Sequence, residues 1–179
     1  INGGTVEGTG NWNAPIKLNG IARFAGHLNL NELGGGMTGS GGFAQIGPIG
    51  AFSRINVGEV VLWGTNTYTG PTTVHMGTLI LKKAASLYNA DSASWTASKI
   101  TVHPTATLQI SAGGPGEFTG EHISALLPNL TTSVNENGLQ SRSVFCVDTS
   151  KSTSPIIVNA NISDSNGNGG GACDINLEF

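Results

Sequence analysis

The chain has 179 residues, which is enough for one domain with a sizeable core, and it is poor in charge. Charged residues make up 11% of it, against a usual ~25%. The eight basic residues are scattered along the chain, and the net charge is −3. This composition offers no electrostatic footprint for nucleic acid or an anionic membrane, and no run approaches the ~18 apolar residues of a membrane span. Because the first residue is Ile1 and the chain ends on an apolar strand, we expect a fragment of a longer protein.

Residues 1–56 are dominated by short alternating runs that end in glycine or asparagine. Such runs occur at 4–6, 16–18, 21–24 and 27–30, and a glycine-rich corner follows at 34–42. Alternation of apolar and polar residues predicts half-buried strands, and Gly and Asn between them predict tight corners. We expect short strands here, and the first stretch with helix-compatible composition comes only after residue 81.

The most informative stretch is 59–81, EVVLWGTNTYTGPTTVHMGTLIL. It predicts strands at 59–62, 72–74 and 78–81, separated by a polar corner at 64–71 and a glycine corner at Gly77. Strands this short and this evenly spaced favour a coil whose turns pair with the turns before and after them. The positions expected to point into such a coil are Val60, Leu62, Val74, Leu79 and Leu81.

Residues 64–81, GTNTYTGPTTVHMGTLIL, resemble the autotransporter-associated β-helix repeat, with Asn66, Tyr68 and Gly70 among the matching positions. The resemblance implies an all-β fold, a right-handed parallel β-helix, with residues 1–179 forming a single β-helical domain. It also implies an exported bacterial protein, extracellular or at the cell surface and attached to the outer membrane through parts outside this chain. A β-sandwich is the alternative fold, because short strands with regular turns are also its signature.

The chain departs from the repeat after residue 81. Residues 82–98 predict a loop with a short helical turn, and 99–102 and 106–110 predict two further strands. Residues 111–153 are expected to form an excursion that packs on the coil or caps it. Within it, HISALLPNL predicts a helix of at most two turns that Pro128 ends, and 143–147 predicts a strand. Strands are expected again at 155–162 and 174–179.

The stretch VFCVDTSKS at 144–152 contains a candidate catalytic residue, Asp148. An apolar strand that ends in Asp-Thr-Ser resembles the active-site turn of aspartic peptidases, in which two carboxylates share a proton to activate water. The motif occurs once and Ser150 stands where that family has glycine, so the second carboxylate would come from Asp164, Asp174 or another chain. The other hypothesis is that Asp148 begins a turn and accepts hydrogen bonds from nearby backbone amides.

Residues 164–169, DSNGNG, match the first half of a calcium loop. The candidate ligands are Asp164, Asn166 and Asn168, but Ile175 stands where the loop needs a bidentate acid. We expect a polar glycine corner here instead of a metal site. The four histidines have no metal-ligand spacing, and the sequence predicts no cofactor.

The two cysteines and the aromatic residues complete the set of candidates. Cys146 and Cys173 form either a disulfide, worth roughly 3 kcal/mol in the chain-entropy model, or two buried thiols. Trp63, Tyr68 and Trp95 are candidate stacking partners for a glycan.

These observations predict a structural or adhesive segment of an exported surface protein, with no catalysis of its own. The expected partners are host or matrix glycans or proteins, and neither nucleic acid nor membrane insertion by this segment is expected. Two alternatives stay open, namely an aspartic-type peptidase that uses Asp148 and a glycan-binding module that uses the aromatic residues.

Overall fold

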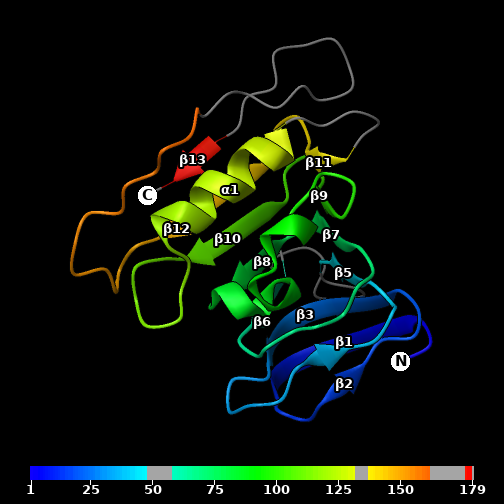
Figure 1. Cartoon of the computed structure of the whole chain (residues 1–179). Coiled ribbons are helices and arrows are strands. Elements are labelled where there is room, and N and C mark those ends of the chain that lie inside the picture. Colours follow the sequence, from blue (N-terminus) through cyan, green and yellow to red (C-terminus); the bar gives the residue numbers. More distant parts are fainter. Residues whose placement is uncertain (48–57, 132–136, 162–175, 179) are drawn as a thin grey trace.

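The structure is a computed structural model that describes residues 1–47, 58–131 and 137–161, together with the backbone of 176–178 (Figure 1). Within these residues the protein is mostly parallel β-sheet with few helices. The strands along the chain are β1 (Gly4–Trp12), β2 (Ile16–Lys17), β3 (Ala22–Leu30), β4 (Met37–Thr38), β5 (Phe43–Ile46), β6 (Glu59–Leu62), β7 (Thr72–Met76), β8 (Thr78–Leu81), β9 (Ile100–Val102), β10 (Thr107–Ser111), β11 (Gly138–Leu139), β12 (Val144–Asp148) and β13 (Asn176–Glu178).

Most predicted strands are present, and those at 59–62 and 78–81 have the expected bounds. The runs predicted at 21–24 and 27–30 form one strand, β3, in which Gly26 has a φ of 94° and lies against the backbone of Gly8. A Cβ at Gly26 would come within 2.1 Å of the Gly8 carbonyl oxygen, so the close approach of β1 and β3 requires glycine here. The strand predicted at 155–162 is wrong over 155–161, because this part of the chain is irregular and does not pair with any of the described strands.

Apart from β1, which pairs with β3, and a separate pair formed by β2 and β4, the strands form two parallel ladders that meet at β3. The first half of β3 pairs with β5, and the ladder continues through β7, β9 and β11. The second half of β3 pairs with β6, and that ladder continues through β8, β10, β12 and β13. From β5 to β12 the chain therefore visits the two ladders alternately. Every strand pair in the described part of the chain is parallel, which contradicts the β-sandwich alternative with its antiparallel sheets.

The core lies between the ladders and consists of columns of stacked apolar side chains. One buried column, set by the ladder register, contains Leu28, Val60, Leu79, Leu108 and Phe145. The five side chains that were expected to point inward from 59–81 are all 0% exposed, which confirms that expectation. Val61 and Ile80, which lie between these positions on the opposite face of their strands, are also buried, at 6% and 7% exposure, so alternation identified the inward side chains but not every buried one.

The principal helix, α1 (Gly120–Thr131), buries Ile123, Leu126, Leu127 and Leu130. Its first turn is capped reciprocally, since the His122 amide donates to Thr119 Oγ1 and the Thr119 amide donates to His122 Nδ1, both at 3.2 Å. The expectation that Pro128 ends this helix is wrong, because the helix continues through Thr131. Pro128 removes the N–H that would reach the Ser124 carbonyl, yet the last turn is retained with Leu130 fully buried.

Residues 82–98 form the expected loop, in which short 3-10 turns occur at η2 (Ala84–Ser86), η3 (Tyr88–Ala90) and η4 (Ser92–Ser94). In the predicted excursion, α1 departs from the ladders, whereas β11 and β12 continue them. In Figure 1, α1 lies over the end of the molecule that contains β10 and β12, and β1 and β2 lie at the opposite end.

Candidate functional site

Asp148 lies at the end of β12, where the ends of the neighbouring strands β6, β8, β10 and β12 line up. Ladder register places Asp148 beside Ser111, the last residue of β10, and pairs Ile110 with Leu81, so that Lys82 follows β8 in the same row. The Lys82 Nζ atom lies 3.2 Å from Ser111 Oγ and 3.5 Å from Asp148 Oδ2. We refer to Lys82, Ser111 and Asp148 as the Asp148 corner.

The carboxylate of Asp148 is held by a turn. The Ser150 amide donates a 3.0 Å hydrogen bond to Asp148 Oδ1, as the turn hypothesis expects. The hydrogen bonds from Ser150, followed by the charge of Lys82, hold the pKa of Asp148 below its usual value. The partners of Asp148 among the described residues are Ser150, Lys82 and Ser111, and none of these is a carboxylate. Asp164 and Asp174, the proposed dyad partners, lie outside the described residues.

The contact between Lys82 and Ser111 is unsuited to nucleophilic catalysis. A lysine that activates a serine must be uncharged to take the proton, but here Lys82 donates to Ser111 and pairs with the Asp148 carboxylate. Ser111 is also 2% exposed, so a substrate has no access to its hydroxyl. The geometry of the Asp148 corner fits a polar clamp across three strand ends.

Sequence reasoning found Asp148 and missed Lys82 and Ser111. A signal was available, because each of the three comes directly after a four-residue run rich in apolar residues: TLIL precedes Lys82, TLQI precedes Ser111 and VFCV precedes Asp148. Trp63 follows EVVL in the same way, and the Lys82 amide bonds to the Leu62 carbonyl next to it. Aligning the four strands by their ends would have placed these side chains in one row.

Trp63 is the partly exposed member of the three candidate glycan contacts. The Nζ atoms of Lys82 and Lys151 each lie 5.9 Å from its ring centroid, and Lys151 also pairs with Glu117 at 3.8 Å. The Trp63 Nε1 atom is buried and has no hydrogen-bond partner among the described residues. Two ammonium groups therefore already lie close to the ring that a sugar would need.

Tyr68 and Trp95 are buried, at 1% and 0% exposure, which corrects the expectation that they offer their ring faces to a glycan. Their polar atoms are satisfied inside the protein. The Tyr68 hydroxyl lies 2.6 Å from Thr72 Oγ1, and Trp95 Nε1 donates to the Leu87 carbonyl at 3.2 Å. Burial raises the pKa of Tyr68, and it raises that of the neighbouring Tyr88 to about 12.

The calcium candidates Asp164, Asn166 and Asn168 lie outside the described residues, as does Cys173. The disulfide between Cys146 and Cys173 therefore stays a prediction. Elsewhere in the described chain, no group of three or more His, Cys, Asp or Glu side chains is placed to hold a metal ion. None of the described helices is long and apolar enough to cross a membrane.

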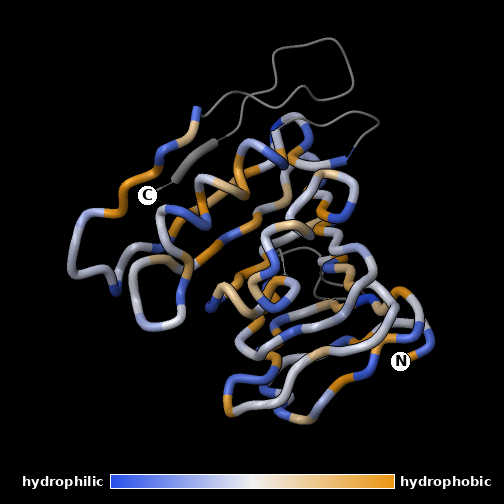
Figure 2. The backbone as a smooth tube through the Cα atoms, in the orientation of Figure 1, coloured by the Kyte–Doolittle hydropathy of each residue, from blue (hydrophilic) through white to orange (hydrophobic). Residues whose placement is uncertain are grey.

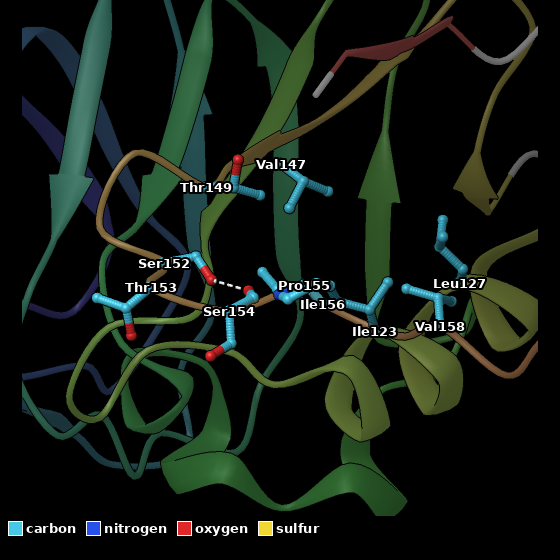
Figure 3. Close-up of a pocket in the computed structure, with 10 residues that line it drawn as sticks. All are labelled: Ile123, Leu127, Val147, Thr149, Ser152, Thr153, Ser154, Pro155, Ile156 and Val158. Carbon is cyan, nitrogen blue, oxygen red and sulfur yellow. Dashed lines mark hydrogen bonds between the residues drawn. The ribbon is translucent and has the colours of Figure 1, made fainter.

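A pocket of about 450 Å³ opens between α1 and the irregular segment 152–158 (Figure 3). Val147 lies in its wall, and the next residue, Asp148, contributes its side chain to the Asp148 corner instead. The pocket is lined by Ile123, Leu127, Val147, Thr149, Ser152, Thr153, Ser154, Pro155, Ile156 and Val158. Apolar side chains dominate this lining, and hydroxyl groups are the side-chain polar groups in it.

Comparison of the chain with protein-family models, with curated proteins and with solved structures gives no match. The resemblance of residues 64–81 to the autotransporter-associated repeat thus depends on the residues quoted for it.

Proposed function

We propose that the chain is a right-handed parallel β-helix that serves as a structural or adhesive segment of an exported bacterial surface protein. The observation that supports this function best is the position of Asn66, a residue of the repeat motif. Its side chain accepts a hydrogen bond from the Met37 amide and donates one to the Ser86 carbonyl, each 2.8 Å long and buried. A single side chain thereby ties its own turn of the chain to the turn before and the turn after.

Other residues of the motif also link successive turns of the chain. Gly70 lies so close to the preceding turn that a Cβ there would come within 2.5 Å of the Gly41 backbone. The hydroxyl of Thr72 bridges Tyr68 and Tyr88 at 2.6 and 2.9 Å, and Tyr88 also donates to the Gly70 carbonyl. These side chains hold stacked turns together, which is what a repeat needs when each turn can bury its apolar face only against its neighbours.

The role of scaffold also accounts for the Asp148 corner better than catalysis does. Its charges compensate each other, and its serine is buried. An adhesive role would use the outer surface, with host or matrix glycans or proteins as partners. Of the three aromatic candidates, Trp63 is the one that such a partner could reach.

Surface display tests the proposal. The chain is placed between an export signal and an outer-membrane anchor in a bacterial host, with an epitope tag at its outer end. We expect antibody to reach the tag on intact cells, and we expect Asn66→Ala to lower the displayed amount severalfold. The matched control is Thr67→Ala, which changes an exposed neighbour in the same corner and should leave display unchanged.

An activity assay and a binding assay complete the test. The purified chain should leave an unfolded protein substrate intact between acidic and neutral pH, and it is screened in parallel on a glycan array. Cleavage that Asp148→Asn abolishes would replace this proposal with the peptidase alternative. Glycan binding that Trp63→Ala removes would identify the adhesive surface.

A further inference from the structure

The pocket beside α1 is bounded by a segment whose two ends are fixed to the rest of the protein. The segment 152–158 is fixed to the helix beyond the pocket by the Asn159 amide, which donates to Ser124 Oγ at 2.9 Å. It also passes so close to Gly120 that a Cβ there would lie 1.9 Å from the Ile157 carbonyl oxygen. At its other end, Ser152 lies so close to Gly113 that a Cβ there would come within 2.5 Å of the Ser152 side chain. The segment is therefore attached on both sides of a space that it does not fill.

The exposure of the segment alternates in a way that points side chains into this space. Ile156 and Val158 are partly buried and line the pocket, whereas Ile157 between them is 69% exposed. Figure 2 shows this stretch as a hydrophobic run on the outer part of the chain. On the facing side, α1 contributes Ile123 and Leu127. Apolar side chains from both α1 and the segment thus line the pocket (Figure 3).

The chemistry of the lining restricts what the pocket can hold. No charged residue is among the described lining residues, and the nearby Lys151 is directed to Glu117 and Trp63. The polar side chains of the lining are the hydroxyl groups of Thr149, Ser152, Thr153 and Ser154. A carboxylate or ammonium group would lose hydration here without gaining a partner of opposite charge, whereas a hydroxyl or carbonyl could hydrogen-bond.

The volume fits a small ligand. At about 450 Å³ it is within the ~300–1,000 Å³ typical of ligand pockets. It corresponds to the liquid volume of roughly 15 water molecules, at ~30 Å³ each. A short aliphatic chain with one polar end matches both this size and the division of the lining into apolar walls and a hydroxyl-bearing side.

We propose that the pocket between α1 and segment 152–158 binds an uncharged aliphatic molecule of this size that carries one hydroxyl or carbonyl group. This inference goes beyond the structural or adhesive role and does not depend on it. The walls bind the aliphatic part, and the hydroxyl groups of Thr149, Ser152, Thr153 and Ser154 bind the polar end.

The test compares two probes with the same chain, 1-octanol and octanoate, at neutral pH. Methyl NMR of the full chain follows Ile123, Leu127, Val147, Ile156 and Val158. Octanol should shift these methyl signals in a saturable manner, and octanoate should bind at least tenfold more weakly. Absence of saturable shifts with octanol would overturn the proposal, and so would octanoate binding as tightly as octanol.

Two neighbouring residues provide matched variants. Ile156→Ala removes a wall residue and should weaken octanol binding at least fivefold, whereas Ile157→Ala changes an exposed residue and should leave it within twofold. Equal weakening by both variants would show nonspecific association and overturn the proposal. The core methyl signals of Leu79 report whether each variant is folded. If Ile156→Ala disturbs them, Thr153→Tyr at the exposed rim takes its place, with the same fivefold weakening expected and unchanged binding counting against the proposal.

Discussion

The motif region, residues 64–81, and the helix region, residues 112–131 and 137–158, are held together in different ways. In the motif region, buried side chains such as Asn66 and Thr72 make hydrogen bonds from one turn of the chain to the next, and Gly70 brings backbones into direct contact. In the helix region, α1 contributes apolar side chains, and segment 152–158 is attached to it by the bond from Asn159 to Ser124. A pocket remains between them.

The two regions differ in how tightly their elements are packed: in the motif region successive turns are in direct contact, and the helix region leaves a pocket. A buried hydrogen bond fixes the distance between two groups, so turns tied by such bonds stay tightly packed. Apolar contacts are non-directional and can leave a space between two elements. We therefore expect substitutions in the motif region to cost stability, whereas substitutions in the helix region change the pocket more than the fold.

The largest expected effect is that of Gly70→Val. The new Cβ would lie within 2.5 Å of the Gly41 backbone, which belongs to the preceding turn and cannot move without separating the turns. We expect a loss of about 4 kcal/mol or more in the free energy of unfolding, measured by urea denaturation. The exposed neighbour provides the control, because Thr69→Val should change that value by less than about 0.5 kcal/mol. Equal stability of Gly70→Val and the parent chain would contradict the close contact between turns.

Asn66→Ala should have the next largest effect. It leaves the Met37 amide and the Ser86 carbonyl buried without their partner, and each such group costs roughly 1–3 kcal/mol. We expect the free energy of unfolding to fall by about 3 kcal/mol. The control is Asn29→Ala, which removes an exposed 3.0 Å bond to Asn11 and should cost less than about 1 kcal/mol. Similar losses for the two variants would mean that Asn66 does not tie the turns together.

Gln45 is an exception within the buried core, and replacing it should increase stability. It is 0% exposed, and both of its side-chain amide atoms lack a hydrogen-bond partner in the described part of the chain. Ladder register aligns it with the core residues Phe24 and Val74. Gln45→Met should raise the free energy of unfolding by about 1–2 kcal/mol, because a buried unpaired amide is removed.

The control for Gln45 is Gln109→Met. Gln109 is partly exposed and lies between the buried Leu108 and Ile110 on β10, so it points away from the core. Its replacement should change stability by less than about 0.5 kcal/mol. Thermal denaturation of both variants checks the prediction, and a lower melting temperature for Gln45→Met would show that its amide has a partner.

The positions of the strands could be predicted because the signals for them are local. The short apolar runs are separated by Gly or Asn corners that are visible in the sequence itself, so the strands at 59–62 and 78–81 were found with their bounds. The end of α1 was not predicted correctly, because the helix retains a packed last turn after Pro128 that the local sequence does not reveal. The apolar run at 155–158 has the composition of a strand, but it lies along a helix instead of a sheet edge.

Only the part of the candidate site that depends on residues adjacent in the sequence was predictable. The Asp-Thr-Ser sequence indicates the turn at Asp148, and the bond from Ser150 follows. Lys82 and Ser111 come from turns 66 and 37 residues away, so their contacts with Asp148 depend on strand register. Tyr68 was misjudged because it lies in a corner, where alternation along a strand does not define direction, and its partner Thr72 holds it in the core.

Asp148→Asn should affect stability only slightly. The side chain can still accept from the Ser150 amide, and the lost ion pair with Lys82 is partly exposed, with 21% and 26% of the two side chains accessible. We expect a loss below about 1 kcal/mol at neutral pH. Because the pKa of Asp148 is held below 3.8, its contribution is complete above that pH and is lost as the pH falls through the folded value. The difference from the parent chain should therefore shrink in acid, and a difference that grows in acid would contradict the turn.

The smallest expected effect concerns the outer face of the sheet at β7 and β9, where the rings of His75 and His103 stack with centroids 4.5 Å apart. Burial, then the proximity of His103 and of Arg23, lowers the pKa of His75 below its usual 6.5. Between the folded pKa and 6.5 the unfolded chain binds more protons, so stability falls as the pH drops through this window and levels off below it. His75→Asn should reduce this acid sensitivity, measured as the change in urea midpoint between pH 8 and about pH 5.5. The exposed His27 is the control, and an equal reduction by His27→Asn would show that the stacked pair has no special role.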